Sequence, residues 1–395
     1  MDKLPKLSKA FFINGGAGRV VCSIPALEKY ASDSGDEDFV IVSESWEELY
    51  QASFPLRDRV YKLDHKGLFE EKLQNKEIVS PEPYRLNAYF NQECNLVQAF
   101  DIIINDLDYI PTGHEHKTPH LELNKTEQII GHNIVNEVRE VTGRDKVVVF
   151  QPFGQSVQVE GKFIFDTSGR SFEIINVVEI IEELKKEYGV IIMSQIEIPS
   201  WQEMGIAMPK NLNLLQWSGV INASNYFLGC DSVGQHLAVA VSKPATVVLG
   251  STYPENISYT NVNSHTIIDL GKDKRIYSPI RLSMDASRDR QNEDMMILAP
   301  SQVKDVILSI KNSIGVSKKT TPNPELKTPN PNISQDNKPR IPKITKSGQS
   351  ITKKLLTPPK PVAGFNKPTI SKPSKKKPID QLVEMELNKT EESNS

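Results

Sequence analysis

The sequence has little cysteine and no long apolar run. Cys22, Cys94 and Cys230 are odd in number and far apart in 395 residues, so they match neither a disulfide framework nor a metal cluster. We therefore predict buried, reduced thiols and a reducing compartment. No apolar run approaches the roughly 18–20 residues that span a bilayer, and the first residues lack the apolar core of a signal peptide. These absences predict a soluble, cytoplasmic protein.

Two common nucleotide-binding signatures are also missing. Gly15, Gly16 and Gly18 do not reproduce the Gly-x-Gly-x-x-Gly fingerprint, and no Walker A motif is present. Asp106 and Asp108 form an Asp-x-Asp triplet of the kind that binds metal in some enzymes. Because such a triplet arises easily by chance after an apolar segment, we predict no metal site.

Charge is distributed unevenly along the chain. Residues 316–378 hold fifteen lysines and arginines against two acidic residues, whereas residues 1–315 carry a net charge of −12. The segment 316–395 has too little apolar surface to offset the entropy of ordering. We predict that it is a disordered Pro/Lys-rich tail whose charge permits non-specific contact with a polyanion or a protein. Phe365 is its only aromatic residue, so base stacking is unsupported.

The first third of the chain alternates apolar runs with helical patterns. We predict strands at 10–14 and 39–42 and helices at 20–30, 46–54 and 86–100, the last leading into the apolar run 102–104. The pattern fails over 111–124, where proline and glycine interrupt it. We therefore predict a first α/β lobe over 1–124.

The second third has a more regular alternation. We predict strands at 147–150, 190–193, 212–215, 226–229 and 246–249, and helices at 174–188, near 220, at 235–241 and at 301–310. This spacing is typical of a parallel sheet with right-handed crossovers. A second α/β lobe is therefore predicted over 125–315.

A strand-to-helix turn in the second lobe indicates a binding site. Asp231 and Ser232 end a strand, and a helix begins almost at once. The first N–H groups of a helix lack intrahelical partners and carry the positive end of its dipole, so they can seat a diphosphate. Gly234 would let the ligand approach the backbone, and His236 would add a donor. An ordinary N-cap with a core-facing histidine is the alternative.

The same turn resembles a family motif. Asp231, Ser232, Gly234, Gln235 and His236, with Pro244 and Gly250 beyond them, resemble the Asp-Ser/Thr-Gly-x-x-His-Leu pattern of glycosyltransferase family 9, the ADP-heptose:lipopolysaccharide heptosyltransferases. The glycine lies one position later than in the family. The resemblance implies a GT-B-like fold of two facing Rossmann-like lobes. It also implies a nucleotide-diphosphate sugar in the second lobe, a glycan or other hydroxyl acceptor in the first, and inverting transfer without metal or cofactor.

A second match departs from the family at an informative position. Residues 18–27 resemble the family's Gly-Asp-x-(apolar)-x-(Ser/Thr)-x-Pro-Ala-Leu loop, but Arg19 replaces the Asp thought to act as general base. An arginine stays protonated and cannot remove a proton from an acceptor hydroxyl. Asp64, Asp106 and Asp108 are conceivable substitutes, and nothing in the sequence selects among them. Arg19 could instead pair with a phosphate or an anionic acceptor.

Two further residues complete the predicted donor site. Arg170 precedes the helix at 174–188, where the family has a basic residue that reaches the donor phosphates; a solvated loop arginine is the alternative. Gln151 leaves the strand at 147–150, where family members line the donor cleft. The resemblance, which covers roughly residues 9–310, implies a glycosyltransferase. The alternatives are a catalytically degenerate sugar-nucleotide-binding scaffold with a basic recruiting tail, or an epimerase on the same fold.

Overall fold

The computed structural model describes residues 7–160, 163–166, 168–196, 201, 205–275 and 295–319. Of the tail predicted over 316–395, all but residues 316–319 lies outside the described residues. These four residues pack on the second lobe: the Ser317 hydroxyl donates to Asp145 at 2.6 Å, and Lys319 forms an antiparallel bridge with Arg144. Residues 316–319, which the prediction assigned to the tail, therefore contact the second lobe.

The first lobe is built on a four-stranded parallel sheet in the order β3-β2-β1-β4. Its strands are β1 (Ser8–Ile13), β2 (Val40–Ser43), β3 (Val60–Lys62) and β4 (Lys76–Val79). The two predicted strands are confirmed as β1 and β2. Strands β3 and β4 were not predicted, because they are short and only partly buried and therefore lack an apolar run.

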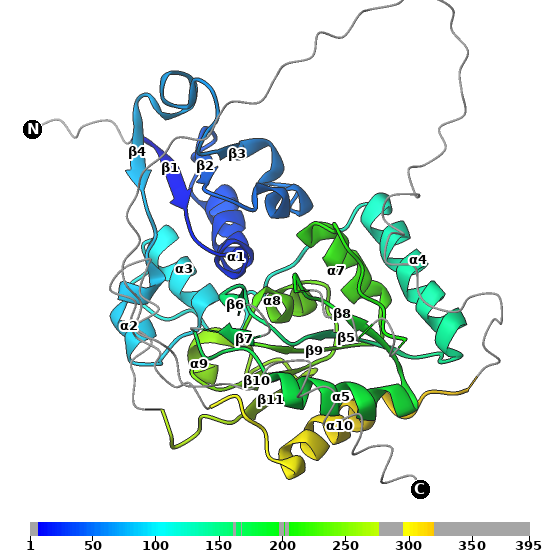
Figure 1. Ribbon diagram of the computed structural model, residues 1–395. Helices are drawn as coiled ribbons and strands as arrows, with labels where there is room; N and C mark the ends of the chain where they lie inside the picture. Colours follow the sequence, from blue (N-terminus) through cyan, green and yellow to red (C-terminus); the bar gives the residue numbers. More distant parts are fainter. Residues whose placement is uncertain are drawn as a thin grey trace, which may run out of the picture.

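Helices α1 (Ala17–Asp33) and α3 (Leu96–Ile104) pack against each other beside this sheet (Figure 1). The single helix predicted over 86–100 is wrong. The chain instead forms η4 (Pro83–Arg85), α2 (Asn87–Phe90) and then α3. Asn95 and Gln98 form a reciprocal capping box that starts α3 at Leu96, and the apolar run 102–104 is its last turn.

The rest of the first lobe consists of short helical turns. The helix predicted over 46–54 is a 3-10 helix, η1 (Glu47–Ala52). It is followed by the 3-10 turn η2 (Arg57–Arg59) and the π-helical turn η3 (Leu68–Leu73).

The second lobe contains a five-stranded parallel sheet in the order β11-β10-β9-β5-β8. Its strands are β5 (Val147–Gln151), β8 (Gly189–Ile192), β9 (Tyr226–Cys230), β10 (Ala245–Leu249) and β11 (His265–Asp269). Helices α4 (Lys125–Thr142), α7 (Leu214–Ala223) and α8 (Val233–Ala240) cover one face, while α5 (Ile174–Glu187) and α10 (Pro300–Ile314) cover the other (Figure 1). The predicted parallel sheet is confirmed.

One predicted strand in this lobe is wrong. Residues 212–215 enter α7, because the Asn213 side chain accepts the N–H of Gln216 at 2.8 Å and the Gln216 side chain accepts the N–H of Asn213 at 3.0 Å. A four-residue apolar run does not by itself distinguish a buried strand from the first turn of a buried helix, and this capping box decides for the helix.

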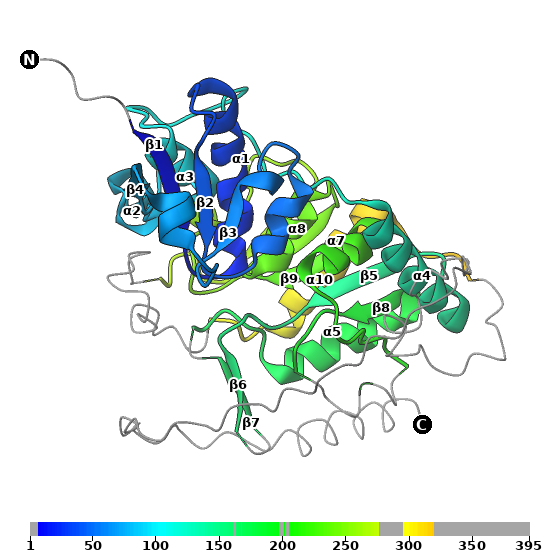
Figure 2. The same ribbon diagram turned by 90° about the horizontal axis from the view of Figure 1, so that it is seen from above.

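Several elements of the second lobe were not predicted from the sequence. These are α4, β11, the single-turn helix α9 (Pro254–Ile257) and the antiparallel hairpin of β6 (Val157–Glu160) and β7 (Phe163–Asp166). The hairpin projects from the body of the lobe (Figure 2). Asn124 caps α4, which packs along α7; the lobe boundary at 124/125 stays a prediction.

Buried contacts join the two lobes. Helix α1 packs on α8, and a Cβ on Gly18 would lie only 3.0 Å from the His236 ring. The Asn256 amide of the second lobe donates to the carbonyls of Tyr89 (2.7 Å) and Cys94 (3.2 Å) in the first. One cluster of buried hydrophobic residues also runs through both lobes.

Two sequence-level expectations concern the whole chain. All three cysteines are buried and free, which confirms the prediction of buried thiols. Within the described ranges, no helix is both long and apolar enough to cross a membrane.

The close contact between α4 and α7 predicts that one added methyl group will lower the stability of the fold. A Cβ on Gly131 of α4 would lie 2.1 Å from the carbonyl oxygen of Gly219 in α7. We expect Gly131→Ala to lower the free energy of unfolding by roughly 2–3 kcal/mol through overpacking, measured by urea denaturation. The exposed neighbour Asn133→Ala is the control and should change it little; equal stability of the two variants would contradict this packing.

Candidate functional site

A cavity of about 430 Å³ lies between the two lobes. The glycine turn after β1 and the start of α1 form its first-lobe wall, and the carboxyl ends of β5 and β9 form its second-lobe wall. Eight predicted site residues line it: Gly16, Gly18, Arg19, Gln151, Arg170, Asp231, Ser232 and His236. The other predicted residues do not line it: Gly15, Asp64, Asp106, Asp108, Gly234 and Gln235.

Strand order explains why the cavity lies here. In the second sheet the crossover direction reverses between β5 and β9, and in the first sheet between β1 and β4. Open α/β sheets bind ligands in the crevice beyond the carboxyl ends of the strands at such a reversal. The cavity touches the second crevice directly, and Arg19 lies in the first.

Gln151, the last residue of β5, spans the crevice of the second sheet. Its amide nitrogen donates to the Ser232 hydroxyl at 3.1 Å, and its amide oxygen accepts the N–H of Gly234 at 2.9 Å. A Cβ on Gly234 would lie 2.3 Å from that oxygen. The glycine therefore makes room for Gln151 rather than for a ligand, and one N–H at the start of α8 is already occupied.

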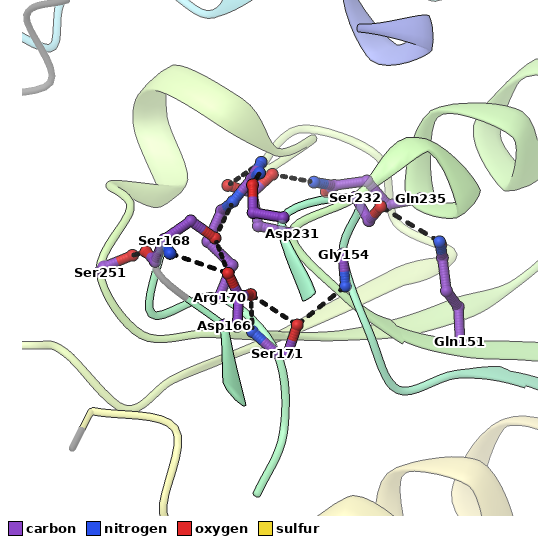
Figure 3. A network of polar contacts seen from close by, with 11 residues as sticks. Gln151, Gly154, Asp166, Ser168, Arg170, Ser171, Asp231, Ser232, Gln235 and Ser251 are labelled. Atoms are coloured by element: carbon purple, nitrogen blue, oxygen red, sulfur yellow. Dashed lines mark hydrogen bonds and ion pairs between the residues drawn. The ribbon is translucent and has the colours of Figure 1, made fainter. Parts of the chain in front are cut away.

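Arg170 faces the start of α8 from the loop after β7. Its Nε donates to the Ser168 hydroxyl at 2.9 Å and its Nη2 to the Ser156 hydroxyl at 3.3 Å (Figure 3). Its Nη1 lies 3.9 Å from Oδ2 of Asp231. Arg170 is thus a positioned, mostly buried cation on the cavity wall and not a solvated loop residue.

Asp166, which was not predicted as a site residue, holds the Ser168 hydroxyl that binds this arginine. Its carboxylate accepts the N–H and hydroxyl groups of both Ser168 and Ser171. Burial alone would raise the pKa of Asp166, but these hydrogen bonds and the nearby Arg170 charge hold it below its usual value. The pattern Asp166-x-Ser168-x-Arg170-Ser171 is the local signal that could have identified the group.

Asp231 and Gln235 lie at the back of the same wall. The Gln235 side chain is fully buried and donates to Asp231 Oδ1 at 3.2 Å. Asp231 is also almost completely buried. Both residues therefore orient the turn and Arg170, and Gln235 does not line the cavity.

His236 forms part of the lobe junction. Its Nδ1 lies 2.8 Å from the Tyr259 hydroxyl and 3.4 Å from Cys22 Sγ, which belongs to the first lobe. Burial lowers the pKa of His236 to about 4, although Asp231 opposes this effect. The imidazole is therefore neutral at pH 7, so it offers no positive charge toward a phosphate.

Arg19 does not have the free guanidinium that a phosphate ligand requires. Its Nε donates to the Asn14 carbonyl at 2.9 Å, and its Nη2 donates to Asn14 Oδ1 and the Pro81 carbonyl. Its Nη1 forms an ion pair with Glu82 at 3.0 Å, and the plane lies over the Tyr84 ring. Arg19 is only 3% exposed and closes the crevice between β1 and β4.

The three aspartates considered as substitute bases lie outside this cavity. Asp64 lines a second cavity, of about 610 Å³, at the carboxyl ends of β2 and β3. Asp106 and Asp108 follow α3 and line neither cavity. Within the described residues, no group of three or more His, Cys, Asp or Glu is placed to hold a metal ion.

The cavity therefore presents hydrogen-bond donors at one end. The Ser232 hydroxyl accepts from Gln151, so its own hydrogen stays available for donation. Val233 occupies the first position of α8, where a helix gives the N–H no partner. Together with Arg170, these groups can bind an anion through directed donors.

Comparison with known proteins supports the fold. No protein-family model matches the chain, and no curated protein matches it in sequence. Among solved structures, a glycosyl transferase family 9 protein from Veillonella parvula superimposes with a TM-score of 0.53 at 10% identity, covering 78% of this chain and 98% of that one.

Two structures from Escherichia coli are similar to the same extent. ADP-heptose lipopolysaccharide heptosyltransferase II gives a TM-score of 0.50 at 12% identity, with 76% and 98% of the chains covered. The iron-containing dodecameric glycosyltransferase TibC of enterotoxigenic E. coli gives 0.51 at 15% identity, with 79% and 81% covered. At these identities the likeness shows the shared GT-B-like fold alone, which confirms the predicted fold class.

The Arg19 ion pair predicts a stability effect. Arg19→Met would leave Glu82 and two carbonyl oxygens without their donor, so we expect the free energy of unfolding to fall by about 3 kcal/mol. The exposed Arg57→Met is the matched control and should cost little. Equal urea midpoints for the two variants would show that Arg19 does not brace the crevice.

Protonation of His236 predicts acid sensitivity. The histidine titrates near pH 4 when folded and near about 6.5 when unfolded. The unfolded state therefore takes up a proton first as the pH falls through this window. We expect His236 to account for about 2 kcal/mol of the stability lost between pH 7 and pH 5.

Urea unfolding of the parent and of His236→Gln at both pH values tests this expectation. The variant should lose less stability on acidification. His265, whose pKa is lowered to about 4 by burial and by the nearby His236, is present in both proteins and contributes acid sensitivity to each. An identical pH dependence would contradict the neutral buried state of His236.

Proposed function

We propose that the chain is a glycosyltransferase that moves a sugar from a nucleotide-diphosphate donor to a hydroxyl acceptor. The supporting observation is the interlobe cavity, where Arg170, the Ser232 hydroxyl and the Val233 N–H converge at the carboxyl end of β9. A diphosphate matches this arrangement, because a helix start and an arginine fork both favour phosphate oxygens.

The remaining walls suit the other parts of such a donor. Trp46, Phe153 and Trp217 line the cavity with aromatic surface that a nucleobase or sugar ring can contact. Gln155 and Asn213 add polar side chains. One of the similar structures is an ADP-heptose-dependent heptosyltransferase, so ADP-heptose is the first donor to test.

In the proposed reaction, the acceptor oxygen attacks the anomeric carbon in line with the departing diphosphate, which inverts configuration. Negative charge develops on the diphosphate as the glycosidic bond breaks. Arg170, Ser232 and the α8 N-terminus lie where they would stabilise that charge without a metal ion, because they are already oriented by Asp166, Ser168 and Gln151.

A second candidate function follows from Arg19. Its guanidinium is engaged by Asn14, Pro81 and Glu82, and it stands at the position that resembles the family's base. This observation favours a sugar-nucleotide-binding scaffold without turnover. Turnover in the presence of any donor separates the transferase from the scaffold, and donor isomerisation without an acceptor would instead identify an epimerase.

Three broader features belong to the proposal. We place the protein in the cytoplasm, a location consistent with its three free thiols. We divide the body into an acceptor lobe over 1–124 and a donor lobe over 125–315. The basic segment beyond residue 319 would contribute non-specific polyanion or protein contacts.

A thermal-shift screen of the full chain with ADP-, UDP-, GDP- and CMP-sugars tests donor binding. A ligand at 100 times its dissociation constant should stabilise the native state by about 2.7 kcal/mol, seen as a higher melting temperature. Arg170→Met removes a charged hydrogen-bond donor worth about 1.5–3 kcal/mol, so the affinity should fall by one to two orders of magnitude.

Arg144→Met is the matched control, since the Arg144 side chain donates to the Lys186 carbonyl on the far side of the second lobe and does not line the cavity. This variant should bind the donor as the parent does. If no sugar nucleotide shifts the parent, or if Arg170→Met binds equally well, the proposed donor site is wrong.

A further inference from the structure

The second cavity opens beside the first. Its lining residues follow β2 and β3: Glu44, Ser45, Trp46, Glu47, Glu48, Lys62, Leu63 and Asp64. Trp46 lines both cavities, so they adjoin at this residue. The free space next to a donor bound in the first cavity would therefore be the second cavity, at the end of β2 in the first lobe.

Transfer to a hydroxyl group needs a residue that removes the proton. Several carboxylates near the first cavity are committed to other contacts. Asp231 is buried beside Arg170 on the donor wall. Asp166 accepts four hydrogen bonds from two serines. Glu82 is held by Arg19 and lines neither cavity.

Glu44 is placed differently from these three carboxylates. Its backbone N–H donates to the Ile13 carbonyl at 3.2 Å, so the end of β1 fixes its position. Its Oε2 accepts the N–H of Gly15 at 3.0 Å. Gly15 has a φ of +87°, which a glycine adopts without strain. The turn it forms presents Gly16 to the first cavity.

Glu44 therefore stands where the cavities meet. It lines the second cavity, touches the glycine turn that lines the first, and lies two residues before the shared Trp46. Glu47 of the same cavity is paired with Lys62 at 2.6 Å. Within the described residues, no hydrogen bond or ion pair joins Glu47, Glu48 or Asp64 to the glycine turn.

We propose that Glu44 is the general base of the reaction and that the second cavity admits the acceptor. This inference rests on the proposed transferase function. The acceptor O–H gives its proton to the Glu44 carboxylate as its oxygen bonds to the anomeric carbon. The bond from that carbon to the diphosphate breaks, and the nucleoside diphosphate leaves with the electron pair.

Donor hydrolysis, with water as the acceptor, tests the base without knowledge of the natural acceptor. The full chain is incubated with ADP-heptose, UDP-glucose and GDP-mannose, and release of the nucleoside diphosphate is followed across a range of pH. We expect Glu44→Gln to lower the rate constant by about 10²- to 10⁴-fold and to remove the decline in rate toward low pH. Its amide oxygen can still accept the Gly15 N–H, so the donor affinity should stay within about twofold of the parent.

Asp58→Asn is the matched control, because Asp58 is an exposed carboxylate of the same lobe away from both cavities. It should hydrolyse the donor at the parent rate. The proposal is overturned if Glu44→Gln keeps the parent rate and pH profile, if it loses donor binding together with activity, or if the parent binds a donor without any turnover. Failure of every sugar nucleotide to bind would instead overturn the proposed function itself.

Discussion

The site depends on how Gln151 joins two strand ends. This one side chain connects β5 to the first turn of α8 by donating to Ser232 and accepting from Gly234. The strands it links are those between which the crossover direction reverses. Because its amide oxygen accepts the Gly234 N–H, the start of α8 has fewer free N–H groups for an anion than the sequence motif suggests. The same contact excludes any side chain at Gly234.

Two arginines on the cavity wall show how surroundings determine the use of one residue type. Arg170 is held by serine hydroxyls and lies 3.9 Å from the nearest Asp231 oxygen, which leaves its charge oriented toward the cavity. Arg19 donates four hydrogen bonds, to the Asn14 carbonyl, Asn14 Oδ1, the Pro81 carbonyl and Glu82. A buried guanidinium whose N–H groups mostly bind protein acceptors stabilises the fold, whereas one with unused N–H groups can bind a ligand.

Buried polar groups meet at the junction of the two lobes. His236 and Tyr259 of the second lobe meet Cys22 of the first in a buried group, and Gly18 lets the His236 ring approach α1. Buried polar groups are costly unless they find partners. These contacts therefore define one relative position of the lobes and hold the first-lobe turn against the donor wall.

The sequence by itself determined the α/β class, the main buried strands and the turn at Asp231, because these features follow from local apolar runs and from residues adjacent in the chain. It also indicated Arg170, Gln151 and the glycine turn as parts of one site. The capping boxes at Asn95 and Asn213 decided helix starts that apolar pattern alone leaves ambiguous.

Only the tertiary structure decided what those residues do. Arg19 donates hydrogen bonds to Pro81 and Glu82, about sixty residues further along the chain. These contacts form only because β4 pairs beside β1. The junction of the cavities at Trp46 depends on the lobes packing together. Hydrogen bonds between groups far apart in sequence leave no local signature, so the fold alone assigns Arg19 to bracing and brings Glu44 to the cavity edge.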